Sequence, residues 1–549
     1  MTEHTPKVCD VLVVGAGIGG IYAVHRFRRQ GLSVVGLEGA PELGGVWYHN
    51  AYPGARVDIE SEYYCYLNDP DLYSEWKWQE RYASQGEILA YLNHVADRWD
   101  VRRHFRFSTW MVDATWDPEQ ERYLVHTDDG STYLARYLVM TSGQLSKPRD
   151  PGFPGLEEFE GEWYQTSHWP HRDVELAGKR IGIIGTGSSG VQAITALGPI
   201  AQELFVFQRT PNYSAPAHNR PVDTERFSRL GQDLEATWRE VLAAPAGNLF
   251  PPTAGPADDY SPEEQQKLLE QRWAFGGQPM LSAFSDQGID REVNAIVSEF
   301  VRSKIRQKID DPEVAALLEP TAYPIGVRRL CVDTGYYETF NRDNVTLVSL
   351  LREPIGRVTT TGIATSARHI DLDVIILAIG FEAFTGALDA AGIRNENGEQ
   401  PSDRWDHGPR TMLGLMTPGF PNLFLVTGPG SPSVLANMNA ANVQHIDFVA
   451  DLITEAHRRG ADTISPTEEG VERWTARAAE VAEHLIRRQV DNYMVHKNDD
   501  GTRVFIPYAG GFGDYVRHCV AEVDAGYPGF RFTPTPEPAE VVERQVLAR

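Results

Sequence analysis

Three observations on the sequence predict an α/β protein with two similar domains and an inserted helical region. Residues 11–20 read VLVVGAGIGG, and residues 181–190 read IGIIGTGSSG. Each segment is an apolar run that ends in glycines, followed by a helix-compatible stretch and a second apolar run. This is the pattern of a buried parallel strand that turns into a helix. The third observation is a Pro- and Gly-rich stretch at 243–260, after which a helix start follows. We therefore predict two Rossmann-like dinucleotide-binding domains with a helical insertion.

Local patterns place further elements along the chain. Residues 84–99 carry apolar side chains at helical spacing. Within residues 123–140, two short segments of alternating apolar and polar side chains flank a turn, which predicts a β-hairpin within the first domain. Ser261 followed by Glu264 is a capping box that begins a helix. That helix belongs to the insertion, which we expect at 212–320, over a substrate cavity.

The composition disfavours several classes of function. The 549 residues include 51 basic and 76 acidic ones, which gives a net charge of −25 and disfavours nucleic-acid and anionic-membrane partners. No apolar run approaches the ~18 residues of a membrane span, and residues 1–7 lack a signal-peptide pattern, so we expect a cytoplasmic location. The four cysteines lie far apart, which predicts neither a dithiol centre nor a metal site. We expect a monomer or a weak homodimer.

The first glycine segment has the spacing of a dinucleotide fingerprint. Gly15, Gly17 and Gly20 allow a tight turn, close approach of a pyrophosphate and close packing of the helix on the strand. The helix N-terminus offers amides to the phosphates. Glu38 follows the second strand, where an acid can accept hydrogen bonds from a ribose diol. A glycine turn without a nucleotide is the alternative, which the order of strand, glycines, helix, strand and acid disfavours.

The second glycine segment differs from the first where it would meet the ribose. Gly185, Gly187 and Gly190 repeat the spacing, but the next strand ends in Arg209 and Thr210 instead of an acid. An arginine pairs with a 2′-phosphate through charge-assisted hydrogen bonds, so NADPH is favoured over NADH at this site. A surface arginine without a ligand is the alternative.

Two such sites in one chain indicate a flavin and a nicotinamide, because hydride transfer needs the two rings in near contact. We assign FAD to the first site. Without a cysteine pair the electrons cannot pass to a disulfide, so O2 is the natural acceptor.

A longer motif follows the first unit. Residues 44–58 read GGVWYHNAYPGARVD, which matches the pattern [A/G]-G-x-W-x4-[F/Y]-P-[G/M]-x3-D at each defined position. The sequence thereby resembles type I Baeyer–Villiger monooxygenases, and in particular the phenylacetone and steroid monooxygenase branch. The resemblance covers about residues 8–530 and includes the segments GPGSPSVL at 428–435 and PYAGGFG at 507–513. The fingerprint residues that we expect at the cofactors are Gly45, Trp47, Tyr52 and Asp58.

Two positions depart from this resemblance. The family's second fingerprint, F-x-G-x3-H-x3-W-[P/D], is matched at Phe159, Gly161, Trp169 and Pro170. Its histidine position holds Gln165, which cannot become cationic near neutral pH, so we expect an effect on cofactor cycling. His168 is expected to be an ordinary packed or surface histidine. Asn492 stands where related enzymes carry a tryptophan on a mobile loop over NADP.

The resemblance also implies a reaction. NADPH reduces the flavin, oxygen adds at the flavin C4a position, and the resulting peroxide attacks a ketone to give an ester or lactone. Arg329 matches the active-site arginine that stabilises negative charge, and Asp58 matches the acid that orients it. Arg328 resembles the residue that holds the nicotinamide nucleotide. A structural ion pair is the alternative for Asp58 and Arg329. We expect Asn437 and Met438 to shape the pocket for a small-molecule ketone.

The expected domain order follows the chain. Residues 1–147 and 373–532 form the FAD-binding domain, residues 148–211 and 321–372 the NADP-binding domain, and residues 533–549 a poorly ordered tail. Two other functions stay open. One is a flavin monooxygenase that oxygenates nitrogen or sulfur, and the other is a catalytically impaired nucleotide-binding homologue.

Overall fold

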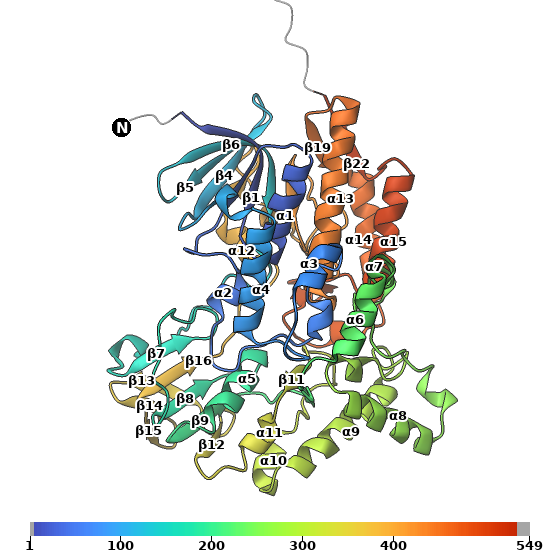
Figure 1. Ribbon diagram of the computed structural model, residues 1–549. Coiled ribbons are helices and arrows are strands. Elements are labelled where there is room, and N and C mark those ends of the chain that lie inside the picture. The colour runs from blue at the N-terminus through green and yellow to red at the C-terminus, as the bar shows by residue number, and fades with distance from the viewer. Residues whose placement is uncertain (1–4, 535–549) are drawn as a thin grey trace, which may run out of the picture.

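The computed structural model describes residues 5–534 and arranges them as two α/β units with a helical insertion beside them (Figure 1). The first unit contains an eight-stranded sheet in the order β17, β4, β5, β6, β1, β2 and β3, with β18 also paired to β6. Its strands are β1 (Lys7–Val14), β2 (Val34–Leu37), β3 (Phe105–Arg106), β4 (Met111–Asp117), β5 (Arg122–Thr127), β6 (Thr132–Met140), β17 (Ile393–Arg394) and β18 (Leu423–Leu425). β1 is parallel to both β2 and β6, as expected for a βαβ unit, and the expected hairpin is the antiparallel pair β5 and β6.

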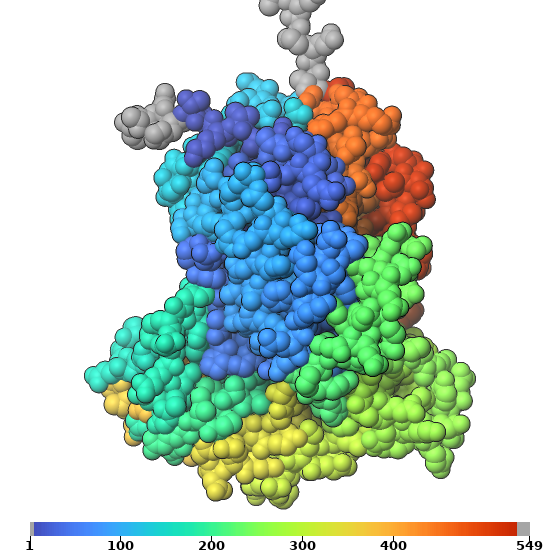
Figure 2. Space-filling model, viewed as in Figure 1, coloured from blue at the N-terminus to red at the C-terminus, as the bar shows by residue number. Residues whose placement is uncertain are grey.

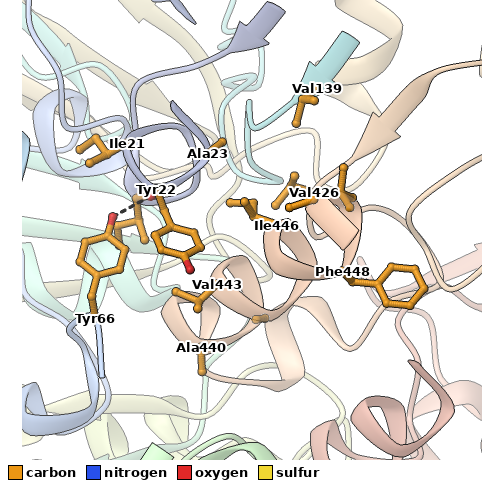
Figure 3. Close-up of a cluster of buried hydrophobic side chains, with 14 of the residues drawn as sticks. Ile21, Tyr22, Ala23, Tyr66, Val139, Val426, Ala440, Val443, Ile446 and Phe448 are labelled. Atoms are coloured by element: carbon orange, nitrogen blue, oxygen red, sulfur yellow. Dashed lines mark hydrogen bonds between the residues drawn. The ribbon is translucent and has the colours of Figure 1, made fainter. Parts of the chain in front are cut away.

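Helices pack on the first sheet, and their buried side chains form the hydrophobic core of the first unit with those of the sheet. α1 (Ile18–Arg29) packs on α13 (Met438–Arg459), which joins the start of the chain to its last third (Figure 3). Ile21 of α1 and Val443 and Ile446 of α13 are fully or almost fully buried in one hydrophobic cluster. The Tyr66 hydroxyl donates a 2.7 Å hydrogen bond to the carbonyl of Ile18. The predicted helix at 84–99 is α4 (Gln85–Arg98), and its N-cap is Ser84.

The second unit is built on a five-stranded parallel sheet in the order β12, β9, β8, β16 and β7. Its strands are β7 (Glu162–Gln165), β8 (Arg180–Ile184), β9 (Glu203–Gln208), β12 (Val345–Ser349) and β16 (Val374–Leu377). α5 (Ser188–Leu197) follows β8, and α11 (Tyr336–Thr339) packs beside it. A small antiparallel sheet of β13 (Ile355–Thr359), β14 (Gly362–Thr365) and β15 (His369–Asp371) lies next to this unit (Figure 1).

The pairing of β16 corrects one expected boundary. We expected the second part of the first domain to begin at residue 373, which would have placed β16 in the first unit. β16 instead lies between β8 and β7, with Val374 opposite Ile181, so it belongs to the second sheet. Its four residues are all buried, and a buried apolar run carries no mark of the sheet that it joins. The chain therefore returns to the first unit after Leu377.

The insertion consists of α6 (Thr224–Gln232), α7 (Leu234–Ala243), α8 (Pro262–Phe275), α9 (Arg291–Lys308) and α10 (Pro312–Leu318). The predicted capping box of Ser261 and Glu264 begins α8. The N-cap side chains of the other four helices are aspartates, which satisfy free amides in the same way. The insertion flanks the N-terminal segments in Figure 2, and Phe227 of α6 stacks on Tyr73 of α3 (Pro70–Glu75) with ring centroids 4.4 Å apart.

The last part of the chain returns to the first unit. It forms β19 (Thr463–Pro466), α14 (Glu468–Ala482), β20 (Val495–Lys497), β21 (Arg503–Phe505), α15 (Phe512–Asp524) and β22 (Phe530–Thr533). Thr533, where we expected the tail to begin, instead pairs with Thr463 as the end of β22. The rest of the expected tail, residues 535–549, lies outside the described residues. Among residues 5–534, no helix has the length and apolar character needed to cross a membrane.

Candidate active site

The first glycine loop leaves room where a phosphate group would approach. Gly15 has φ of +105°, and a Cβ at this position would lie 2.9 Å from the carbonyl oxygen of Thr141. A Cβ on Gly20 would lie 1.8 Å from the Gly15 oxygen, so only glycine lets α1 pack this closely on β1. Gly17 faces Gly45, whose Cβ would lie 2.9 Å from the Gly17 Cα. The cradle is thus formed by bare backbone at the N-terminus of α1, which suits a pyrophosphate.

Glu38 lies at the rim of this cradle, directly after β2. Its carboxylate accepts hydrogen bonds from the amides of Ala16, at 2.7 Å, and Ala40, at 2.8 Å. Burial raises the pKa of Glu38, and these amides act in the opposite direction. The carboxylate is therefore held in place at the glycine loop, as the sequence predicts for an acid that binds a ribose.

The second glycine loop repeats this geometry on the other sheet. Gly185 has φ of +110°, and a Cβ on Gly190 would lie 2.2 Å from the Gly185 oxygen. A Cβ on Gly187 would meet nothing within 4 Å, so the centre of the loop is open. Arg209 is exposed, and among the described residues no ion pair or hydrogen bond reaches its guanidinium. The Thr210 carbonyl accepts a hydrogen bond from Thr186 and holds the two segments together. This arrangement fits a nucleotide phosphate, and the binding role of these residues stays a prediction.

The fingerprint motif connects the two units. The Tyr52 hydroxyl donates a 2.8 Å hydrogen bond to Gln192 of α5. Gln192 in turn donates to the carbonyl of Arg56, at 3.0 Å. Trp47 donates from its indole nitrogen to the Tyr64 hydroxyl, at 3.0 Å. Gln192 carries no local sequence signal, and sequence reasoning missed its role.

Asp58 and Arg329 form a bidentate ion pair. Arg329 Nε lies 2.7 Å from Asp58 Oδ2, and Nη2 lies 2.8 Å from Oδ1. The remaining nitrogen, Nη1, donates to the Val434 carbonyl at 2.8 Å. Burial by itself would lower the pKa of Arg329, but the Asp58 carboxylate raises it above its ordinary value. Arg329 is therefore a permanent cation with a fixed orientation.

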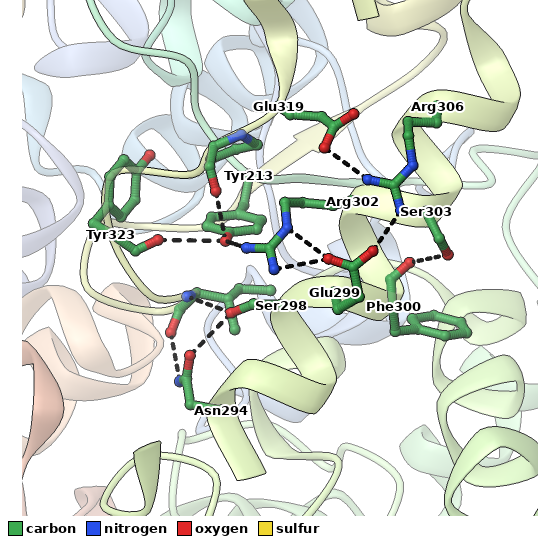
Figure 4. A network of polar contacts seen from close by, with 12 residues as sticks. Tyr213, Asn294, Ser298, Glu299, Phe300, Arg302, Ser303, Arg306, Glu319 and Tyr323 are labelled. Carbon is green, nitrogen blue, oxygen red and sulfur yellow. Dashed lines mark hydrogen bonds and ion pairs between the residues drawn. The ribbon is translucent and has the colours of Figure 1, made fainter. Parts of the chain in front are cut away.

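Helix α9 holds the segment that carries this arginine. Asn294 donates to the carbonyl of Ile325 at 3.0 Å, and Ser298 accepts from the Ile325 amide at 3.1 Å (Figure 4). Nearby, the Tyr213 hydroxyl donates to the Pro320 carbonyl at 2.8 Å. The insertion thus fixes the backbone four residues before Arg329, which explains how a loop can hold a precise position.

A cavity of about 200 Å³ opens beside the ion pair. Arg328, Arg329 and Tyr493 line it, together with Leu435 and Arg487. About a third of the Arg329 side chain, 34%, is exposed. The guanidinium of Arg328 stacks over the ring of Tyr323, with its Cζ atom 4.7 Å from the centroid. A polarised carbonyl in this cavity would meet a fixed positive charge.

The two residues that we expected to shape the pocket, Asn437 and Met438, follow this wall directly. Asn437 and Met438 are not among the residues that line the cavity, whereas Val434, Leu435 and Ala436 are. Asn437 is the N-cap of α13, and its side-chain amide donates to the Tyr63 carbonyl at 2.7 Å. The side chain of Asn437 therefore forms hydrogen bonds to other parts of the protein.

The two departures from the family pattern have structural roles. Gln165 ends β7 and donates to the carbonyl of Arg149 at 2.9 Å. Asn492 donates to the carbonyls of Arg487 and Val490 and accepts from the Met494 amide, so it stabilises a turn. His168 is exposed, and its ring stacks on that of His49 with ring centroids 5.3 Å apart, as for an ordinary surface histidine.

Two glycine-rich strand–helix loops on separate sheets, together with one arginine–carboxylate pair, are typical of an oxidoreductase that uses two nucleotides, and comparisons with known proteins agree. Residues 12–235 match the family model "Pyridine nucleotide-disulphide oxidoreductase". The chain is 36% identical to a Baeyer–Villiger monooxygenase of Pseudooceanicola batsensis, over 96% of this chain and 97% of the relative. It is 37% identical to an acetone monooxygenase (methyl acetate-forming) of Gordonia, over 95% and 98%. The structure of an oxidized steroid monooxygenase bound to NADP matches with a TM-score of 0.92 and 45% identity, over 96% of this chain and all of the other. The chain belongs to the Baeyer–Villiger monooxygenase family, which confirms the resemblance.

Proposed function

We propose that this protein oxidises a small ketone to an ester or lactone by inserting one oxygen atom of O2 next to the carbonyl. As a member of its family it is an FAD- and NADP-dependent monooxygenase. The observation that carries the proposal is the bidentate pair of Arg329 and Asp58 at the wall of a cavity. A neutral ketone becomes an anion when an anionic nucleophile attacks its carbonyl, and the Arg329 guanidinium, oriented by Asp58, supplies N–H donors and a local positive charge to that anion.

The cofactors, when bound, supply the redox and oxygen chemistry, and the protein supplies binding, orientation and charge. We assign FAD to the cradle of Gly15, Gly17 and Gly20, and NADPH to the cradle of Gly187 with Arg209. In the first cradle an added side chain would collide with the backbone, and in the second cradle the centre of the loop is open. Both features leave backbone accessible to a phosphate, which supports this assignment. We also keep the division of the chain into an FAD-binding and an NADP-binding part as a proposal, with the boundary moved to follow β16.

Arg329 has two tasks in this proposal. Its guanidinium orients the ketone by donating to the carbonyl oxygen, and it stabilises the negative charge that develops there. Asp58 holds two of the guanidinium nitrogens, so the orientation is set before substrate binds. Such preorganisation means that little reorientation is needed when the charge forms.

The cavity volume supports a compact substrate. At about 200 Å³ it is smaller than the ~300–1,000 Å³ of pockets that hold drug-sized ligands. One relative is named for acetone and another for cyclohexanone. We infer a small ketone, up to about the size of a monocyclic aryl ketone, for this chain.

Oxygenation of nitrogen is the second candidate function. The chain is 36% identical to a phenazine N-monooxygenase of Lysobacter antibioticus over 96% of its length, so the fold also serves this reaction. The Arg329–Asp58 pair favours the ketone, because oxygen transfer to an amine develops positive charge on nitrogen, which a guanidinium does not stabilise.

Product analysis with purified, FAD-loaded protein tests the choice. We expect ester or lactone to appear in step with NADPH consumption when a panel of linear, cyclic and aryl ketones is offered. A tertiary amine and a thioether serve as matched substrates for the alternative. Oxygenation of the amine with no ester from any ketone would overturn the proposal, and a colourless protein that cannot retain flavin would overturn the cofactor assignment.

We also propose a cytoplasmic location and a monomeric or weakly dimeric state. The four cysteines are all free and buried, which suits a reducing compartment. Light scattering across a range of protein concentrations measures the oligomeric state directly.

A further inference from the structure

Arg487 is a cation in the cavity wall that has no counterion among the residues that the structure describes. It lies in a short 3-10 helix, Ile486–Gln489, and its side chain lines the cavity with Arg328 and Arg329. Within residues 5–534, no hydrogen bond or ion pair reaches the Arg487 guanidinium. The adjacent Arg488 differs, because its Nε donates to the carbonyl of Arg503 at 3.1 Å.

The space beside this guanidinium is open to a ligand. Gly326 lines the same cavity, and a Cβ added there would lie 3.8 Å from Nη2 of Arg487. The absence of a side chain at this position leaves one flank of the guanidinium uncovered. Tyr493 lines the cavity as well and offers a phenol to the same region.

The charge inside the cavity has the opposite sign to that of the whole chain. Three guanidinium groups line it, and no aspartate or glutamate is among the described lining residues. Asp58, just behind Arg329, balances one of the three charges. The site therefore carries about two uncompensated positive charges in a protein whose net charge is −25.

Burial without a partner is unfavourable for Arg487. Burial lowers the pKa of its guanidinium, and the phenol of Tyr493 opposes this shift. A bound anion would relieve the penalty, because a charge removed from water needs a counterion or hydrogen-bond acceptors. The planar fork of arginine matches a carboxylate through two parallel hydrogen bonds.

We propose that Arg487 binds a carboxylate on the ketone substrate, so that the preferred substrates are oxo acids whose carbonyl reaches Arg329. This inference rests on the proposed function and names its substrate class. The nicotinamide nucleotide is the competing occupant, because Arg328, which we expect to hold it, lines the same cavity. The substrate carboxylate is favoured at Arg487, because no residue of either glycine loop lines this cavity and Arg209 stands at the second loop. A keto carboxylate would place its two polar ends on two fixed guanidinium groups.

Two ketones of nearly equal shape test the proposal. The FAD-loaded enzyme is assayed with NADPH and either para-acetylbenzoate or para-acetylbenzamide, and ester formation gives kcat/KM for each. We expect the carboxylate to be preferred by about 10- to 100-fold, the range that charge-assisted hydrogen bonds support. In Arg487→Gln the ratio of the two kcat/KM values should fall to within about twofold, whereas Arg487→Lys should keep part of the preference. Arg352→Gln, at an exposed arginine outside the cavity, is the matched control and should keep the full preference.

A binding measurement separates a substrate site from a nucleotide site. The Kd of para-acetylbenzoate for the oxidised holoenzyme is measured from the change in flavin absorbance, and the Kd of NADP⁺ is measured in the same way. Arg487→Gln should weaken binding of the carboxylate and leave NADP⁺ unchanged. Equal kcat/KM for both ketones in the unsubstituted enzyme, or a weaker Kd for NADP⁺ only, would overturn the inference while ketone oxidation stands. Failure of both ketones and of the wider panel to give ester would instead overturn the proposed function.

Discussion

The Arg329–Asp58 pair can be tested as a catalytic device by separating its effect on rate from its effect on folding. Arg329→Met removes three guanidinium hydrogen bonds, two to Asp58 and one to Val434. Asp58 is then left with one long side-chain contact, from Gln278 at 3.4 Å. Breaking a fully buried pair costs about 3–5 kcal/mol. Because the two side chains are 34% and 20% exposed, we expect about 2–3 kcal/mol of lost stability after allowing for solvent screening.

The rate effect should be separate and larger. Removing a preorganised group that stabilises a developing oxyanion lowers kcat by about 10²–10³, or ~2.7–4 kcal/mol. In Asp58→Asn/Arg329→Met both charges are absent, so no carboxylate is left unpaired and most of the lost stability should return. Ester formation should not return, because the cation is still missing.

Three measurements follow these effects. The unfolding midpoint monitored by flavin fluorescence reports stability, gas chromatography reports ester, and hydrogen peroxide release reports NADPH oxidation that is uncoupled from product. We expect both variants to bind FAD and to oxidise NADPH slowly, with ester formation lowered by about 10²–10³. If the double variant recovers ester formation together with stability, the pair is a structural ion pair and the catalytic reasoning is refuted.

Three further predictions concern cofactor choice, pH and folding. Arg209→Gln should raise KM for NADPH by about 10- to 100-fold and leave KM for NADH unchanged in steady-state assays, because charge-assisted bonds to the 2′-phosphate are lost; equal changes for both coenzymes would contradict this. Burial lowers the pKa of His445 to about 3. This neutral side chain therefore contributes stability that is fully present above pH ~6.5 and is lost by ~1.4 kcal/mol per pH unit as the pH falls from ~6.5 toward 3. His445→Asn, whose amide oxygen can replace Nδ1 as the acceptor for the Thr427 amide, should make urea midpoints at pH 7 and pH 5 more alike, and an unchanged difference would exclude His445 as its source. Glu60→Gln should cost about 3–5 kcal/mol in urea unfolding, because the pair of Glu60 and Arg81 at 2.8 Å is buried, and Glu60→Gln/Arg81→Met should cost less.

The parts of the fold that depend on local patterns could be predicted from sequence. The glycine loops could be predicted, because a tight turn, close approach of a ligand and helix packing each require glycine at a fixed spacing. In the structure an added Cβ would collide with backbone atoms at Gly15, Gly20, Gly185 and Gly190. The capping box at Ser261 has the same local character. The sheet that β16 joins was not predictable in this way, because strand order depends on contacts between distant segments.

The residues of the candidate site also fall into those that the sequence could predict and those that it could not. Asp58 and Arg329 are 271 residues apart, and only the family resemblance suggested that they meet. Arg487 was missed because a charged residue in a polar stretch usually faces solvent, and nothing in its neighbours predicts a cavity wall. Asn437 was placed in the pocket from its loop, whereas its capping role directs its amide inward.

The spacing of the first fingerprint has a physical explanation in how the two units meet. Gly54 has φ of +84°, and a Cβ there would lie 2.6 Å from the carbonyl of Gln192, so the loop touches α5 backbone to backbone. Tyr52 binds the Gln192 side chain from the same loop. Asp58 follows four residues after Gly54 and holds Arg329. One short loop thus links the helix of the second glycine motif to the orientation of the arginine. A shift of α5 relative to the first unit must therefore either break the Gln192 contacts or move the carboxylate that positions the cation.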